Sequence, residues 1–281
     1  MKIRYVGDSC CEFPEDFKKE HDCVNVPLTI MVGDDVIIDD ASFDQADFLK
    51  KVAAYPKCPK SSCPSPEQYM SAFEGDVDIV FVTTLSSELS GSYNSAVLAK
   101  QLYEEDHPDE KKKIHVFNSY SASCGEMQVL LKAAELVEQG LSFEEVVEKT
   151  QKFAYDDLKT YFVLESLETL RKNGRLSTMK ALAATALSIK PVCIGNHGVI
   201  EQVAIARGMK KALEKMVSHS LEQVSSTEDR VLFVAHCNCE KRAEEVTALY
   251  IAKAKFKEIR IINTAGISSL YACDGGIIAT F

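Results

Sequence analysis

The feature that most limits the fold of this chain is an alternation of short apolar runs with segments of helical periodicity. One unit of the pattern is the apolar run 79–82, followed by a polar loop and by the periodic segment 93–102. This order predicts a buried strand, a loop and a helix. Because strands that alternate with helices pair in parallel, the sequence predicts an α/β fold with a mainly parallel sheet in its N-terminal part.

Further segments extend this pattern along the chain. The expected strands are residues 2–7, 23–31, 79–82, 114–117, 161–164, 191–194, 199–205, 231–235 and 258–262. The expected helices are residues 14–20, 43–54, a segment from Ser65, 93–102, 126–139, 142–153, 167–172, a segment from Arg207, and 240–254. The strands 191–194 and 199–205 flank a turn-rich loop and predict a β-hairpin. The small apolar segment 181–187 suits a closely packed helix or the wall of an apolar tunnel.

The length of 281 residues suits two modest domains or one large one. The pattern of elements changes at about Thr160, and we place a domain boundary near Asp156. We therefore expect an N-terminal α/β domain of residues 1–156 and a C-terminal α/β domain of residues 157–281. Strand ends that repeatedly deliver Ser, Thr and Asn predict a ligand cleft at the carboxyl edge of the parallel sheet.

The loop that precedes the periodic segment 93–102 is unusually rich in hydroxyl groups. Four serines surround a single glycine, Gly91, and they are Ser86, Ser87, Ser90 and Ser92. The first N–H groups of a helix lack intrahelical partners, and the helix dipole makes that end electropositive. A phosphate or a carboxylate would fit such a loop. A plain helix cap remains the alternative explanation for any one of these serines.

A second hydroxyl-rich segment lies beside another expected helix start. Ser65 is the expected N-cap, with Pro66 at the first helical position and Gln68 at the capping-box position. Ser61 and Ser62 are not needed for that cap. They supply further hydroxyls for a binding site, although an ordinary turn would also explain them.

Composition and motifs exclude several function classes. Lys plus Arg number 32 against 42 Asp plus Glu, so a net charge of -10 argues against general nucleic-acid binding. Neither common nucleotide cradle, G-x-x-x-x-G-K-[ST] or G-x-G-x-x-G, is present, and the G-x-S-x-G turn of serine hydrolases is also missing. Hydroxyls without an assigned general base bind anions rather than attack carbonyls.

We expect neither a metal, nor another cofactor, nor a membrane anchor. The segment 236–239, His-Cys-Asn-Cys, has no second ligand pair after it and is better explained as a strand end with buried thiols. The ten cysteines are scattered, and the length and apolar content favour reduced thiols. No apolar run approaches the roughly eighteen residues of a membrane span, and the chain enters a strand without a leader. We therefore expect a cytoplasmic protein.

Several segments together resemble the DegV family of bacterial fatty-acid-binding proteins. Residues 61–66, Ser-Ser-Cys-Pro-Ser-Pro, resemble the Thr-Ser-Gln-Pro-Ser signature of that family, and residues 85–96 closely match its second signature. Other matching segments, in the order of the family, are residues 8–9, 26–28, 118–119, 170–177 and 189–191. The resemblance therefore covers nearly the whole chain.

This resemblance implies two α/β domains that enclose one long-chain fatty acid in a cleft between them. The N-terminal domain would supply the loops for the head group, and the C-terminal domain would cover the acyl chain. Some family members serve a bacterial fatty acid kinase, presenting the carboxylate for phosphorylation in phospholipid synthesis. The residues that the resemblance assigns to the carboxylate are Ser61, Ser62, Ser90, Gly91, Arg175 and Tyr271. Arg207 resembles the basic residue that family members use to dock on the kinase.

Two positions depart from the family pattern. The glutamine of the first signature is Cys63 here, and the C-terminal His-x-Gly-Pro-Gly appears as Tyr-Ala-Cys-Asp-Gly at residues 271–275. Tyr271 therefore stands where the family has its head-group histidine. A tyrosine hydroxyl can hydrogen-bond a carboxylate but cannot be cationic, so the departure weakens the implied acyl-phosphate role more than the implied lipid binding.

Three hypotheses follow. The first is a fatty-acid-binding protein without catalysis of its own. The second is an enzyme that acts on a small phosphorylated or carboxylated substrate at the same serine-rich loops, with Asp8, Asp274 or Tyr271 as the base or metal ligand. The third is a family member whose pocket has closed.

Overall fold

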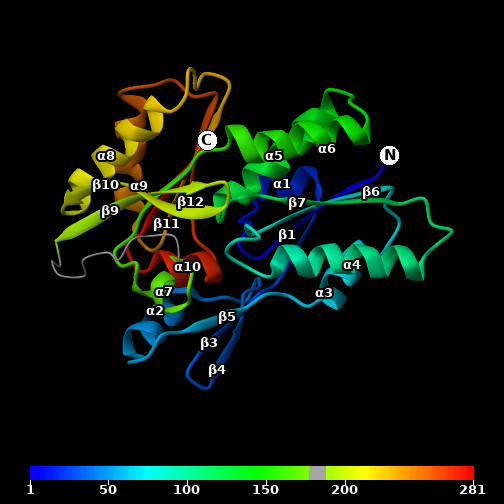
Figure 1. Ribbon diagram of the computed structural model, residues 1–281, viewed down its shortest axis with the longest axis horizontal. Coiled ribbons are helices and arrows are strands. Elements are labelled where there is room, and N and C mark those ends of the chain that lie inside the picture. Colours follow the sequence, from blue (N-terminus) through cyan, green and yellow to red (C-terminus); the bar gives the residue numbers. More distant parts are fainter. Residues whose placement is uncertain (177–187) are drawn as a thin grey trace.

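The computed structural model describes residues 1–176 and 188–281, and its N-terminal part is built on a parallel sheet (Figure 1). The strand order is β2-β1-β6-β7, and all three neighbouring pairs are parallel. The strands are β1 (Ile3–Asp8), β2 (Asp22–Val26), β6 (Ile79–Thr84) and β7 (Lys113–Asn118). The predicted α/β fold with a mainly parallel N-terminal sheet is therefore confirmed.

Helices cover both faces of this parallel sheet (Figure 1). Successive strand residues point to opposite faces, so Tyr5 packs with α1, α5 and α6, while Val6 packs with α3 and α4. These helices are α1 (Glu15–Glu20), α3 (Pro66–Phe73), α4 (Ser92–Asp106), α5 (Cys124–Glu138) and α6 (Phe143–Lys152), followed by a π-helical turn over Phe153–Asp157. The predicted capping box of Ser65 and Gln68 starts α3, and a second box starts α6.

The expected strand 23–31 is wrong, because two strands of different sheets occupy it. β2 ends at Val26, and β3 (Thr29–Val32) belongs to a small antiparallel sheet with β4 (Asp35–Ile38) and β5 (Lys60–Ser62). Pro27 stands between them and has no N–H to donate to a sheet, so the pairing is interrupted there. Ser61 and Ser62 consequently lie in a strand, not in the turn that would have been an alternative.

The C-terminal part contains a second, mixed sheet with the order β10-β9-β8-β13-β11-β12. Only β11 and β12 pair in parallel within it. The strands are β8 (Thr160–Val163), β9 (Ile189–Asn196), β10 (Val199–Arg207), β11 (Val231–His236), β12 (Glu258–Asn263) and β13 (Ile277–Thr280). The remaining helices are α2 (Gln45–Ala54), α7 (Glu168–Lys172), α8 (Met209–Glu222), α9 (Glu240–Ile251) and α10 (Gly266–Ala272). The predicted hairpin is confirmed as β9 and β10.

Helix α5 joins the two sheets into one core. Met127 and Leu130 lie in the same apolar cluster as Tyr5 of β1 and Phe233 of β11. The Gln128 side chain also donates to the carbonyl oxygen of Val231 at 2.6 Å. The proposed division at residues 156 and 157 stays a prediction. The expected helix over 181–187 lies outside the described residues.

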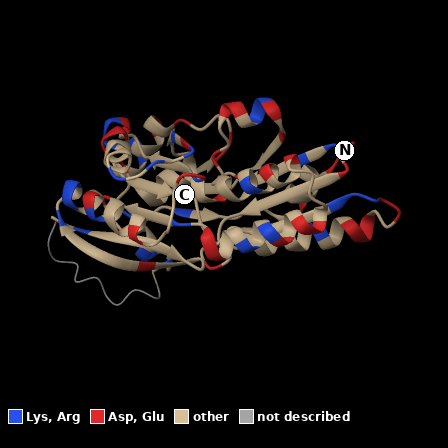
Figure 2. Cartoon of the chain, turned by 90° about the horizontal axis from the view of Figure 1, so that it is seen from above, with Lys and Arg blue, Asp and Glu red and all other residues tan. Residues whose placement is uncertain are grey.

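Charged residues of both signs are interspersed over the helices and loops in Figure 2, while the central strands carry few of them. Within residues 1–176 and 188–281, no helix has the length and apolar character needed to cross a bilayer.

Candidate ligand-binding cavity

A cavity of about 320 Å³ lies between the loops of the N-terminal part and the second sheet. All six residues that the family resemblance assigned to a carboxylate line it, and they are Ser61, Ser62, Ser90, Gly91, Arg175 and Tyr271. These residues come from β5, from the loop before α4, from the end of α7 and from α10. The fold thus brings together side chains that are up to 210 residues apart in sequence. The structure therefore has an open cavity at these residues, in contrast to the hypothesis of a closed pocket.

Most of the cavity wall is apolar. In and after strand β8, the alternate residues Thr160, Phe162 and Leu164 line the cavity, whereas Tyr161 and Val163 pack into the core on the opposite face. At about 3.3 Å per residue, Thr160 and Leu164 lie roughly 13 Å apart along this wall. Leu164 belongs to the cluster that packs against Tyr271, so Thr160 lies toward the other end. The wall is therefore a long apolar surface with Tyr271 near one end.

The hydroxyl groups of Ser61 and Tyr271 meet at the polar end of the cavity. Ser61 Oγ lies 2.9 Å from the Tyr271 hydroxyl oxygen, and either can donate. Ser61 is fixed by the pairing of β5 with β3, where it lies opposite Ile30. Each hydroxyl retains capacity for a second hydrogen bond to a ligand.

Arg175 supplies a cation at the same end. Gly174 has a φ of 78°, its N–H donates to Arg171 O, and the N–H of Arg175 donates to Leu170 O at 2.8 Å, which together form a Schellman motif that ends α7. The guanidinium donates from Nε to Leu89 O at 3.1 Å and lies 5.6 Å from the centre of the Tyr271 ring. Among the described residues, no carboxylate forms an ion pair with Arg175. The backbone carbonyl groups of Leu89 and Asn173 thus hold this arginine in place.

The serine-rich loop divides into structural and cavity-facing hydroxyls. Ser86 is buried and donates to Gly198 O, and Ser92 is buried and donates to Asp8. Ser90 lines the cavity, and its Oγ accepts a hydrogen bond from the Ser92 N–H at 3.2 Å. One serine of the loop therefore caps the backbone of α4 and faces the cavity at the same time. Gly91 leaves little space beside Cys63, since a Cβ there would lie 3.1 Å from the cysteine Sγ.

Asp8 hydrogen-bonds both ends of this loop and does not line the cavity. It is fully buried, and its carboxylate accepts hydrogen bonds from Leu85 N at 2.9 Å, Ser92 Oγ at 2.6 Å and Cys10 N at 3.0 Å. Burial raises the pKa of Asp8, and its hydrogen bonds partly oppose that rise. Asp274 is exposed and bonds Asn238. Of the three acid–base candidates for an enzyme, Tyr271 alone lines the cavity.

The resemblance missed a pair of hydroxyls on the cavity wall. Ser121 Oγ and Thr160 Oγ1 are 2.7 Å apart and satisfy each other. Ser121 belongs to the polar segment that follows β7, which predicted a cleft but no particular contact. Thr160 begins β8 and carried no signal of its own in the sequence.

Arg207 lies apart from the cavity, exposed at the end of β10. His236 ends β11 as expected, and its Nδ1 accepts a hydrogen bond from the Cys239 N–H at 3.2 Å. Within the described part of the chain, no group of three or more His, Cys, Asp or Glu residues could hold a metal ion.

The chain is similar to proteins of known sequence and structure along its whole length. Residues 2–278 match the sequence model of the DegV family, which is described as a family of uncharacterised proteins. A DegV domain-containing protein of Streptococcus pneumoniae is 40% identical over 282 residues, which cover 99% of this chain and 98% of that protein.

Two solved structures share the fold. A DegV family protein of Ruminococcus gnavus, refined with vaccenic acid, is 47% identical with a TM-score of 0.95, covering 99% of both chains. The Fatty Acid Kinase B3 protein of Streptococcus pneumoniae, loaded with linoleic acid, is 35% identical with a TM-score of 0.87, covering 100% of this chain and 99% of that chain. The family match, the sequence relatives and the shared α/β architecture agree, and the chain belongs to the DegV family.

Proposed function

We propose that this protein binds one long-chain fatty acid and has no catalytic activity of its own. The observation that carries the proposal is a single cavity whose long apolar wall ends at a cation and a group of hydroxyls. Its relatives solved with vaccenic acid and linoleic acid support the same ligand class. An acyl chain suits the apolar wall, and a carboxylate suits the polar end.

Most of the binding energy would come from the acyl chain. Burial of a methylene contributes roughly 0.8 kcal/mol, so a chain of about sixteen carbons offers on the order of 10 kcal/mol before the costs of association. The head group adds less and mainly fixes the direction in which the chain enters. We assign its contacts to Ser61, Ser62, Ser90, Gly91, Arg175 and Tyr271.

The two parts of the chain would contribute different portions of the binding site. Residues 1–156 would supply the hydroxyl loops, and residues 157–281 would supply Arg175, Tyr271 and much of the apolar wall. The ligand would need neither a metal nor another cofactor.

The relative named as a fatty acid kinase protein supports a partner as well. We propose that a fatty acid kinase in the cytoplasm docks on a surface that includes the exposed Arg207. Replacement Arg207→Glu should weaken co-purification with such a kinase and leave fatty acid affinity unchanged. An equal loss of both would show that Arg207 acts on the fold instead.

The head-group assignment is tested by Arg175→Gln. A hydrogen bond to a charged group contributes about 1.5–3 kcal/mol, so we expect the affinity of delipidated protein for oleic acid to fall roughly 10- to 100-fold. Titration calorimetry measures it, with Lys172→Gln on the neighbouring helix α7 as the control. An Arg175→Gln variant that binds oleic acid as tightly as the wild type would contradict the assignment.

A further inference from the structure

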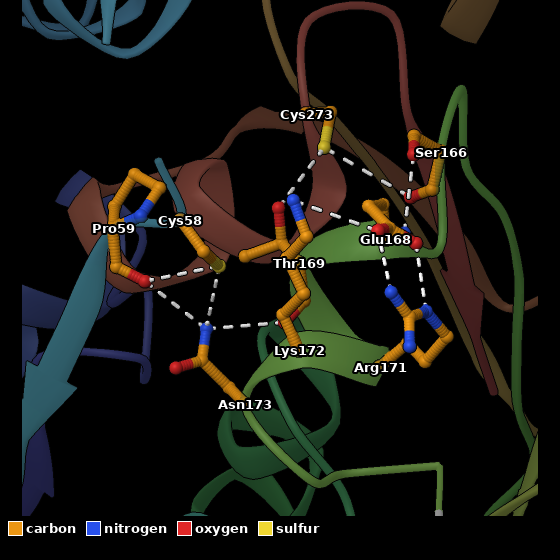
Figure 3. Close-up of polar contacts among 9 residues, drawn as sticks. All are labelled: Cys58, Pro59, Ser166, Glu168, Thr169, Arg171, Lys172, Asn173 and Cys273. Carbon is orange, nitrogen blue, oxygen red and sulfur yellow. Dashed lines mark hydrogen bonds and ion pairs between the residues drawn. The ribbon is translucent and has the colours of Figure 1, made fainter. Parts of the chain in front are cut away.

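Four of the six residues assigned to the head group lie on three short segments that meet around the end of α7. Ser61 and Ser62 belong to β5, Arg175 follows α7, and Tyr271 lies in α10. Helix α7 contains only five residues, so its own hydrogen bonds hold it weakly. Contacts with neighbouring segments must therefore fix its position, and Figure 3 shows those contacts.

Asn173 caps α7 and connects it to the segment that leads into β5 (Figure 3). Its Nδ2 donates to Pro59 O at 3.1 Å and to Thr169 O at 3.1 Å, and it lies 3.4 Å from Cys58 Sγ. Pro59 immediately precedes β5 and is two residues from Ser61. The carboxamide thus links the end of α7 to the residue before the strand that carries the hydroxyls.

The backbone of the same residue holds Arg175. Arg175 Nη1 donates to Asn173 O at 2.6 Å, while Nε donates to Leu89 O in the serine-rich loop. Asn173 therefore bonds the residue just before β5 through its side chain and the guanidinium through its carbonyl oxygen. Tyr271 contacts β5 and the guanidinium from inside the cavity, through its hydrogen bond to Ser61 and through its ring, whose centre lies 5.6 Å from the guanidinium.

The segment that carries Tyr271 contacts α7 at Thr169, one helical turn before Asn173. Thr169 O accepts from both the backbone N–H and the side chain of Asn173, each at 3.1 Å. Thr169 Oγ1 lies 4.0 Å from Cys273 Sγ, two residues beyond Tyr271 (Figure 3). This weaker contact adds the Tyr271 segment to the same cluster.

We propose that Asn173 is a positioning residue of the head-group site, which sets the separation between the Arg175 guanidinium and the β5 hydroxyls. The inference rests on the proposed fatty acid binding and extends it to the preference for a carboxylate over an uncharged head group. Asn173 does not line the cavity and need not touch the ligand. The strength of a charge-assisted hydrogen bond depends on distance and direction. Displacement of the guanidinium therefore weakens the binding of a carboxylate head group, whereas the binding of the acyl chain to the apolar wall is unaffected.

The test compares two probes of equal chain length, oleic acid and oleyl alcohol, on delipidated protein. Asn173→Ala removes the side-chain donors, and Asn173→Leu removes them at similar volume without adding a charge. Loss of one positioning hydrogen bond is worth about 1 kcal/mol, so we expect both variants to lower the ratio of acid to alcohol affinity roughly 5- to 10-fold. The affinity for oleyl alcohol should stay unchanged. Lys172→Gln, next to Asn173 on α7 and exposed, is the matched control and should keep the wild-type ratio.

Each other outcome overturns the inference in a distinguishable way. An unchanged ratio in Asn173→Ala would show that Arg175 is positioned without the carboxamide. An equal loss of acid and alcohol affinity would show that Asn173 only supports the fold, and far-UV circular dichroism would reveal whether the variant is unfolded. Wild-type protein that binds neither probe would overturn the proposed function, and this inference with it.

Discussion

Two buried carboxylates, Asp8 and Asp39, bond backbone groups that determine the shape of the cavity. Asp8 binds the start and end of the serine-rich loop, while Asp39 accepts from the N–H groups of Gly266 and Ile267 at 2.7 and 2.8 Å, where α10 begins. The partners of Asp39 are 227 and 228 residues away in sequence. No local pattern could predict such contacts, because capping signals describe only neighbours along the chain.

The titration of Asp39 gives a prediction about stability. Burial raises the pKa of Asp39 to about 6, although hydrogen bonds from Ile267, Ser9 and Gly266 oppose the rise. The folded chain therefore binds this proton more tightly than the unfolded chain does, so the contribution of Asp39 to stability is lost as the pH rises from about 4 through 6. Asn at this position cannot titrate. We expect the free energy of unfolding of the wild type, relative to Asp39→Asn, to decrease between pH 4 and 7.

Chemical denaturation of the two proteins at a series of pH values measures this difference. If the difference in free energy of unfolding between the two proteins is the same at every pH, the raised pKa of Asp39 is contradicted, however large that difference is.

At the scale of elements, the sequence predicted those boundaries that have local causes. The capping box at Ser65 placed the start of α3, and the expected segment 167–172 ends at the same residue as α7, just before the Schellman turn at Gly174. Four elements escaped prediction: β4, which pairs with its neighbour β3, and three elements whose partners lie far away in the sequence. β5 is three residues long, and α10 and β13 flank a glycine pair without clear periodicity. Partners distant in sequence stabilise all three, which is why α10, a wall of the cavity, could be placed only from the structure.

The contact between α5 and the segment before it leads to a second stability prediction. A Cβ on Gly125 would lie 1.8 Å from Ser121 Oγ and 2.8 Å from Ser121 Cβ. Gly125→Ala must displace Ser121 or α5, and overpacking of this kind typically costs about 1–3 kcal/mol. Denaturant unfolding should show this loss. Ser121→Gly removes the clashing atoms but also the partner of the Thr160 hydroxyl, so the comparison is made within the Ser121→Gly background. There Gly125→Ala should cost much less than in the wild type; an equal cost in both backgrounds would contradict the steric explanation.

At the scale of the whole molecule, the cavity lies between two sheets that share the core around α5. The six residues assigned to the head group came from family motifs, and their common location was predictable only through that resemblance. Their mutual contacts were not. The bond between Arg175 and Leu89, for example, joins residues 86 positions apart. Such contacts depend on how all helices and strands pack together, which no single segment of the sequence specifies.

The most direct test of the central claim is native mass spectrometry of the purified protein, followed by organic extraction and identification of the released molecule. The structure and the family predict a mass increase equal to one long-chain fatty acid per chain, recovered intact on extraction. Protein that carries no lipid, and that gains no such mass after incubation with oleic acid, would contradict the account and favour a small substrate at the serine-rich loop.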